Sequence, residues 1–109
     1  MKSENTKAQM RKGVLEYCIL LTLQNKDQYV SGIIENLKKS KIIVVEGTLY
    51  PMLTRLKNEG YLGSRWEESL QGPPRKYYEL TQTGKLFLNE LENVWNELVD
   101  AVFHINARK

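Results

Sequence analysis

The sequence has few of the residues that build disulfides, metal centres and most catalytic sites. Its 109 residues include one cysteine, Cys18, and one histidine, His104. One thiol cannot form an internal disulfide, and one cysteine with one histidine cannot supply the ligand cluster of a zinc site. The sequence also shows no Ser/His/Asp set and no glycine-rich phosphate loop. We therefore expect a protein that is not an enzyme and that has no catalytic residues, no metal and no cofactor.

Long hydrophobic runs are lacking as well. The longest, residues 14–23, contains Glu16 and Thr22, and it is far shorter than the roughly 20 apolar residues that a transmembrane helix needs. The first residues show no basic stretch followed by an apolar stretch and a small-residue cleavage site, which a secretion signal would have. We therefore expect no membrane partner and a location in the cytoplasm.

The composition supports one domain with a modest core. Hydrophobic residues make up 41% of the 109 residues, which leaves little room for a second domain. The formal net charge of +3 is mild and does not by itself identify a partner. Its placement is more informative, because basic residues gather in two segments that we expect to be neighbours: Arg55, Lys57, Arg65, Arg75 and Lys76. This pattern predicts a basic face.

Apolar spacing predicts helices in the first half of the chain. Residues 8–24 form the first helix, which is apolar nearly all round from Val14 on. We expect the chain's own core to cover one side of it and a second subunit to cover the other. A short amphipathic helix follows and ends near Lys39. Residues 42–45 are β-branched, which favours an extended connector.

The stretch "EGTLYPMLTRLKNEG", residues 46–60, predicts a third helix. Its leucines share one stripe, which we expect to be buried. Proline is tolerated in a first helical turn because its missing N–H would be unpaired there, so Pro51 places the helix start at about residues 47–48. Gly60 suits the end of the helix, where a left-handed residue is common.

A hairpin and a long helix complete the chain. Residues 61–67 and 75–80 are predicted strands, joined by "ESLQGPP", whose glycine and prolines favour a turn and stop the pairing. Thr81 is the predicted N-cap of a helix that runs to about Asn106. Its apolar residues keep a heptad seam: Leu88, Leu91, Trp95, Leu98, Val102 and Ile105. At about 1.5 Å per residue this helix is about 40 Å long, more than the domain's own core needs, so we expect it to pack on another subunit.

These elements predict a mostly α-helical fold with a β-hairpin wing. Residues 1–80 would form a winged helix-turn-helix unit, and residues 81–109 a dimerisation helix in the same compact body. The dimer interface would combine the first helix with the heptad seam: Val14, Cys18, Leu21, Leu88, Leu91, Trp95, Leu98, Val102 and Ile105.

The same arrangement predicts a surface for double-stranded DNA. In winged helices the second helix of the motif enters the major groove, while the hairpin tip reaches the backbone or minor groove beside it. The small, polar and basic groups at these places are the predicted DNA-binding residues: Thr48, Tyr50, Pro51, Thr54, Arg55, Asn58, Arg75, Lys76 and Tyr78. Any solvated helix face or hairpin tip can carry such groups. The residues alone therefore leave open a winged-helix adaptor that binds proteins and no specific DNA.

Two stretches resemble a known family. "EGTLYPMLTRLKNEGYLGSRWEESLQGPPRKYYELTQTGK" is similar to the signature region of the PadR family of bacterial transcriptional regulators, and "GVLEYCILLTL" resembles the family's first helix. The single long C-terminal helix resembles the short subgroup. The sequence departs from the family in "KKSKIIVV", which is more aliphatic than usual, and in "QYVSG", where a "YGY" type sequence is common. Both departures lie outside the predicted DNA surface.

The resemblance implies a homodimeric winged-helix repressor that binds an inverted repeat and is released by a small molecule or a stress signal. It places Thr48, Tyr50 and Arg55 at or near the major groove, and Arg75, Lys76 and Tyr78 in the wing. In some relatives a tryptophan at the position of Trp95 stacks on flat aromatic ligands, so the resemblance also implies a candidate effector site there. The alternative is that Trp95 is an ordinary core residue of the seam. Cys18 we expect to be a small core residue and not a redox sensor, because burial raises the pKa of a thiol.

Overall fold

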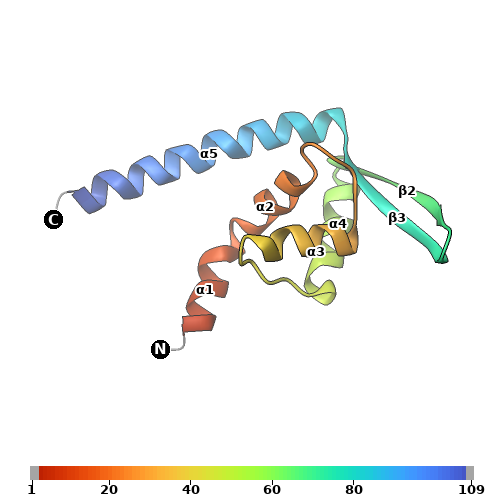
Figure 1. Cartoon of the computed structure of the whole chain (residues 1–109). Coiled ribbons are helices and arrows are strands. Elements are labelled where there is room, and N and C mark those ends of the chain that lie inside the picture. The colour runs from red at the N-terminus through yellow and green to blue at the C-terminus, as the bar shows by residue number, and fades with distance from the viewer. Residues whose placement is uncertain (1–2, 108–109) are drawn as a thin grey trace.

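The structure, a computed structural model, describes residues 3–107 (Figure 1). Within that range the chain forms α1 (Ser3–Lys12), α2 (Leu15–Thr22), β1 (Gln28–Tyr29), α3 (Val30–Lys39), α4 (Glu46–Asn58), β2 (Leu62–Ser69), β3 (Gly72–Leu80) and α5 (Gln82–Ala107). The mostly helical fold with a β-hairpin wing is confirmed. Residues 1–2 and 108–109, the outer ends of the two predicted units, lie outside the described residues.

The core lies where α2, α3 and α4 meet the sheet and the start of α5. The leucine stripe of α4 faces inward as predicted, since Leu49, Leu53 and Leu56 have no exposed surface. Ile19 of α2 and Ile33 of α3 are fully buried beside them. Full burial of such a side chain stabilises the fold by about 1.5–3 kcal/mol relative to its exposed state. The inward leucines therefore fix which side of α4 faces solvent.

Helices α1 and α2 correct the prediction of one helix over residues 8–24. The chain turns at Gly13 and Val14, where the Val14 N–H donates to the Arg11 carbonyl at 2.8 Å. Glycine weakens the middle of a helix, because it has more backbone freedom to lose. The polar sequence of α1 gains little from packing that would hold the two pieces in line.

The start of α4 also differs from the prediction. The helix begins at Glu46, so Pro51 lies inside it, one turn beyond its predicted place. A residue at position 51 would ordinarily donate its N–H to the Gly47 carbonyl, and proline cannot. Gly47 is exposed, so water can reach this carbonyl. The loss of one helical hydrogen bond is therefore tolerated on the solvent side of α4.

The sheet is antiparallel, with the strand order β1-β3-β2. Strand β1 was not predicted. It pairs with β3 through Gln28 opposite Tyr78 and Tyr29 opposite Tyr77, and two residues are too few to show an alternating pattern. Residues 42–45, which were expected to be extended, form no strand. The pairing of β1 brings the start of α3 next to the wing.

The hairpin is longer than predicted, because Pro73 and Pro74 lie inside β3 and do not end the pairing. Its turn is confined to residues 70–71, and the register shifts between Glu67 and Ser69, where β3 has one residue more than β2. Pro73 and Pro74 both stand opposite Glu68, so they form a bulge of β3 where the ladder is interrupted and a missing N–H breaks no regular pair.

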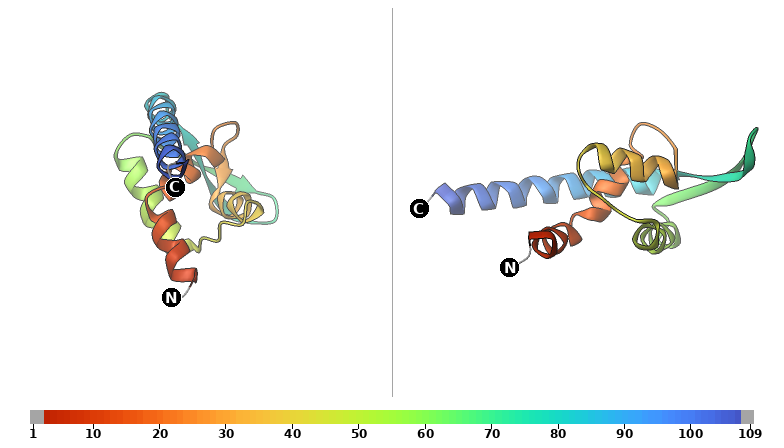
Figure 2. Two further views of the ribbon diagram at one scale, coloured as in Figure 1. Left: turned by 90° about the vertical axis from the view of Figure 1, so that its left-hand side faces the viewer. Right: turned by 60° about the horizontal axis from the view of Figure 1, so that its bottom comes forward.

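Helix α5 begins on the body of the molecule and then leaves it (Figures 1 and 2). The predicted N-cap is confirmed: the Thr81 hydroxyl accepts from the Gly84 N–H at 2.9 Å and donates to the Gly60 carbonyl at 2.6 Å. Gly84 is buried, and a Cβ atom there would lie 2.0 Å from the Tyr61 carbonyl oxygen. Only glycine allows the helix and the chain before β2 to approach this closely.

The heptad seam of α5 divides into two parts. Leu88 is 4% exposed in the chain's own core, and Leu91 packs against that core. Leu88 therefore belongs to the core of its own chain, and its predicted part in a dimer interface stays a prediction. Beyond residue 91 the described residues of α5 are exposed, and the exposed fraction of its large apolar side chains runs from 39% at Trp95 to 71% at Ile105. Figure 2 shows this half of the helix extending away from α3, α4 and the sheet.

Candidate nucleic-acid interface

Helix α4 presents the polar side that the sequence predicts. All six residues assigned to it are exposed: Thr48, Tyr50, Pro51, Thr54, Arg55 and Asn58. Tyr50 and Thr54 face the wing. Arg55 lies on the side turned toward α2. The helix therefore has two polar margins, one beside the hairpin and one beside the N-terminal helices.

The wing carries its basic residues close to α4 and α3. Trp66 is opposite Lys76 in the hairpin register, and the Lys76 Nζ atom lies 5.7 Å from the ring centres of both Trp66 and Tyr78. Arg75 reaches the α3 edge, where its guanidinium carbon lies 4.9 Å from the ring centre of Tyr29. Cations at these distances are attracted by the ring faces. Both charges are thus held near aromatic rings and do not extend freely into solvent.

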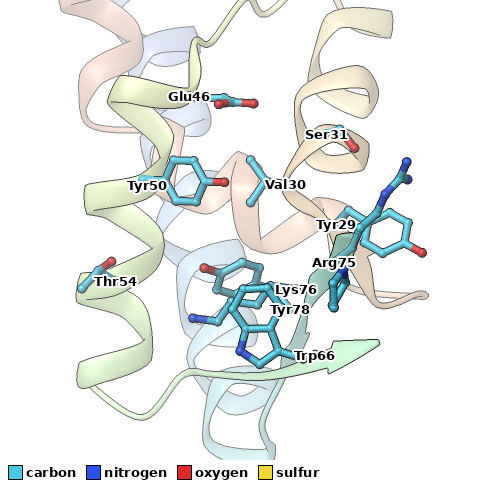
Figure 3. A pocket seen from close by; sticks show the side chains of 11 residues that line it. Tyr29, Val30, Ser31, Glu46, Tyr50, Thr54, Trp66, Arg75, Lys76 and Tyr78 are labelled. Carbon is cyan, nitrogen blue, oxygen red and sulfur yellow. The ribbon is translucent and has the colours of Figure 1, made fainter. Parts of the chain in front are cut away.

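A hollow of about 560 Å³ lies between α3, α4 and the wing (Figure 3). Five of the predicted DNA-binding residues meet there: Tyr50, Thr54, Arg75, Lys76 and Tyr78. In Figure 3 the Tyr50 phenol points from α4 across the hollow, and the Tyr78 phenol and the Lys76 amine point back toward α4. Glu46 is the one carboxylate among the lining residues. The other α4 residues predicted to bind DNA lie outside the hollow, on the exposed side of α4: Thr48, Pro51, Arg55 and Asn58.

Six residues of the hollow were not predicted to take part: Tyr29, Val30, Ser31, Glu46, Trp66 and Pro74. Val30 and Ser31 come from the start of α3, which reaches the wing only through the pairing of β1 with β3. Trp66 lines the hollow from β2 and is 67% exposed. A signal for Trp66 was present, because strand alternation places it on the same face as its partner Lys76 once the hairpin register is known.

Tyr78 is the buried polar side chain of the hollow, 4% exposed. Burial raises the pKa of its phenol, and the neighbouring Tyr50 raises it further. The phenol therefore stays protonated and is a hydrogen-bond donor at neutral pH. Its hydroxyl makes no hydrogen bond to another described residue, and because no described side-chain oxygen is both buried and unpaired, this oxygen is open to solvent. The ring is enclosed, and the hydroxyl ends at the wall of the hollow.

Arg55 is already engaged within the protein. Its guanidinium donates to the Glu16 carboxylate of α2 and lies 3.6 Å from Glu59, the residue that caps the C-terminal end of α4. The hydrogen bond to Glu16 raises the pKa of Arg55, and the attraction of the same carboxylate adds to the rise. The Arg55 side chain is still 49% exposed. DNA that contacts this residue must therefore compete with a carboxylate for it.

Arg65 corrects the predicted basic face. Its guanidinium lies 2.7 Å from Asp27, 2.9 Å from Glu67 and 3.7 Å from Glu79. Hydrogen bonds to Asp27 and then to Glu67 raise the pKa of Arg65. A cation among three carboxylates adds little positive potential to the surface. The basic part of the interface is therefore narrower than the sequence predicts.

Comparison with known proteins decides the family. The family model of the PadR-like transcriptional regulators matches residues 19–90 of the chain. The chain belongs to this family. Its members are transcriptional regulators and not enzymes, which confirms the expectation that the chain is no enzyme. The PadR resemblance of the sequence is confirmed as well.

Solved structures agree with this PadR-like assignment. A PadR-like transcription factor from Bacteroides fragilis is 60% identical, with 93% of this chain and 98% of that chain covered and a TM-score of 0.78. A PadR family regulator from Eggerthella lenta is 31% identical, with 94% and 90% covered and a TM-score of 0.85. Bacillus subtilis PadR, solved in complex with operator DNA, is 27% identical, with 72% and 46% covered and a TM-score of 0.65. The PadR-like winged-helix fold is therefore confirmed.

This PadR-like chain also has an apolar groove of about 700 Å³ between α1, α2 and α5. It brings together most residues predicted for the dimer interface: Val14, Cys18, Leu21, Trp95, Leu98 and Val102. The ring centres of Tyr17 and Trp95 lie 6.5 Å apart across it. Burial raises the pKa of the Cys18 thiol, so it is a weak nucleophile there. Met10 and Tyr17 also line the groove, and the sequence did not single them out.

Among residues 3–107 there is no group of three or more His, Cys, Asp or Glu side chains placed to hold a metal ion. The Nδ1 atom of His104 lies 2.8 Å from the Asp100 carbonyl of its own helix. In the same range no helix is long and apolar enough to cross a membrane.

Proposed function

We propose that this protein is a sequence-specific DNA-binding repressor that acts as a homodimer on an inverted repeat. The hollow carries the proposal, because the polar side of α4 and the basic residues of the wing border the same space. Helix α4 would enter the major groove, and the hairpin tip would reach the adjacent minor groove. The Bacillus subtilis relative solved with operator DNA supports the proposal, since it shares the fold. Such a repressor works in the bacterial cytoplasm, where promoters are found.

The dimer is supported by the apolar surface that one chain leaves open. Helix α5 exposes Leu98, Val102 and Ile105 at 53%, 58% and 71%, and α1 exposes Met10 at 77%. Monomeric proteins rarely expose contiguous apolar patches of this length. Residues 1–80 would be the winged-helix unit, whose first helices share the interface, and residues 81–109 the dimerisation helix. Two α4 helices related by a two-fold axis would meet half-sites about 34 Å apart.

The apolar groove at Trp95 is the proposed binding site of the small molecule that releases the protein from DNA. A flat aromatic molecule would stack on Trp95 and on its copy in the second subunit, with the Tyr17 ring nearby. Titration with a planar aromatic cation, followed by tryptophan fluorescence, tests the site. We expect quenching in the parent and none in Trp95→Phe, which keeps Trp66. Quenching that persists in Trp95→Phe would reject Trp95 as the platform.

DNA binding is tested by titration at several salt concentrations. One duplex is selected by the protein from a randomised pool, and the other is a scrambled duplex of the same composition. We expect the selected duplex to bind more tightly at every salt concentration. No binding, or equal, weak and steeply salt-sensitive binding to both, would favour a winged-helix adaptor. Solution mass tests the dimer, since a species of 12.7 kDa at micromolar concentration would be the monomer.

A further inference from the structure

We propose that the hollow between α3, α4 and the wing is the seat of one DNA backbone phosphate. The amide groups at the start of α3, the phenols of Tyr50 and Tyr78, and the Lys76 amine would donate to that phosphate. The proposal rests on the proposed function and adds residues of α3 that were not among its DNA-binding residues. Two independent observations point to an anion, one on each side of the hollow.

The first observation is the start of α3, which has no cap. This ten-residue helix follows Tyr29, which makes no side-chain capping hydrogen bond, and its first turn contains no acidic residue. The first N–H groups of a helix have no partner within it, and they form the positive end of the helix dipole. Val30 and Ser31 bring this end to the wall of the hollow (Figure 3). Such an end attracts phosphate groups.

The second observation is the Tyr78 phenol on the opposite wall. Its side chain is 4% exposed, its hydroxyl points into the hollow, and no described residue accepts a hydrogen bond from it. The ring is buried, but the hydroxyl oxygen is not buried without a partner, so water reaches it from the hollow and a ligand oxygen can take the place of that water. The Tyr50 phenol points into the same space from α4. Two protonated phenols can donate, and a phosphate oxygen accepts.

The charge around the hollow favours an anion. Lys76 and Arg75 line it, held by the rings of Trp66 and Tyr29, whereas Glu46 is the single acidic residue of its walls. Cations that are already held in place lose less freedom when they bind. A water occupies about 30 Å³, so a hollow of about 560 Å³ accommodates a phosphate together with part of its hydration.

The expected path of the bound DNA would bring a backbone phosphate to the hollow. When α4 lies in the major groove and the hairpin tip in the adjacent minor groove, one backbone strand separates the two grooves. That strand has to cross between α4 and the wing, which is where the hollow lies. A phosphodiester is therefore the expected occupant. Free inorganic phosphate has the same chemistry and is the alternative source.

Replacement of Ser31 by aspartate tests the seat without weakening the fold. An acidic residue in the first helical turn stabilises a helix, so Ser31→Asp should melt at the same temperature as the parent or higher. The same carboxylate would repel a phosphate, so we expect about tenfold weaker binding to the selected duplex and a salt slope reduced by about one ion. Ser40→Asp is the matched control, because it adds the same charge at the other end of α3. It should bind DNA nearly as the parent does.

Replacement of Tyr78 by phenylalanine removes the buried hydroxyl and keeps the ring. A hydrogen bond to a charged group is lost, so we expect about tenfold weaker binding. Tyr61→Phe is the control, since it removes the same hydroxyl from a half-buried tyrosine that stacks on Phe87, away from the hollow. If the parent binds the duplex tightly and both Ser31→Asp and Tyr78→Phe bind it equally tightly, the phosphate seat is refuted. If the parent binds no duplex, the proposed function fails instead.

Neutral linkages in the DNA identify the phosphate itself. A set of selected duplexes, each with one methylphosphonate linkage, is titrated with the parent and with Ser31→Asp. We expect one linkage per half-site that weakens the parent about tenfold and leaves Ser31→Asp unaffected, because the contact is already lost there. Equal sensitivity of both proteins at every linkage would overturn the proposal. Inorganic phosphate is tested as a competitor of the duplex at constant ionic strength. If it competes and no linkage weakens the parent alone, the hollow binds the free ion and the proposal is overturned.

Discussion

Replacement of Glu16 by glutamine should tighten DNA binding, because it frees Arg55 from a contact within the protein. The Arg55 guanidinium donates to Glu16 and lies 3.6 Å from Glu59. A phosphate or base edge that uses Arg55 must displace the Glu16 carboxylate. The two side chains are 49% and 23% exposed, and ion pairs with this access to solvent contribute about 0.2–1 kcal/mol. The dissociation constant should therefore fall by about 1.4- to 5-fold.

A double-mutant cycle separates this competition from simple charge repulsion. The parent, Glu16→Gln, Arg55→Gln and the double variant are titrated with one duplex at one salt concentration. If Glu16 withholds Arg55, the gain from Glu16→Gln disappears in the Arg55→Gln background. An equal gain in both backgrounds would mean that the carboxylate only repels the duplex. Weaker binding by Glu16→Gln would mean that Glu16 positions Arg55 for the groove. Either result refutes the competition.

Three further predictions concern stability and reactivity. Gly84→Ala should lower the free energy of unfolding in urea by about 3 kcal/mol, because its Cβ would lie 2.0 Å from the Tyr61 carbonyl oxygen. Tyr77 should ionise at a pH of about 12 in an ultraviolet titration, since its hydrogen bond with Tyr29 and then burial raise its pKa from 10.0. That contribution to stability is present below pH 10 and is lost as the pH rises toward 12, and an unchanged titration in Tyr29→Phe would contradict the assignment. Cys18 should react with a thiol reagent more slowly in the folded protein than in urea, because burial raises its pKa.

The parts of the fold that the sequence predicts well depend on neighbouring residues. The inward stripe of α4, which includes Leu53, and the cap at Thr81 each follow from spacing within one or two turns, and both are confirmed. The break at Gly13 was also a local signal, but the apolar pattern that follows it favoured one continuous helix. Strand β1 depends on pairing with Tyr77 and Tyr78, far along the chain. No local pattern in two residues predicts such a contact.

The candidate interface was predictable in its residue types and less so in its arrangement. Lys76 and Tyr78 share a face because strand side chains alternate, so their convergence on one hollow follows from the hairpin. Whether each arginine is paired with a carboxylate does not follow from the residues next to it in the sequence. Arg65 is neutralised in part by Asp27, and Arg55 is engaged by Glu16, both from distant parts of the chain. Ion pairs of this kind are set by the packed fold and leave no trace in spacing.

The prolines of β3 affect how this hairpin meets other molecules. Beyond the two residues of β1, the outer edge of β3 is open, and an open strand edge can recruit strands from other chains. Pro73 and Pro74 have no N–H to donate and their backbone is stiff, so an added strand would find a gap in its ladder there. The stretch that carries Arg75 toward a duplex therefore also guards the projecting hairpin against growth into aggregates when many copies are crowded together.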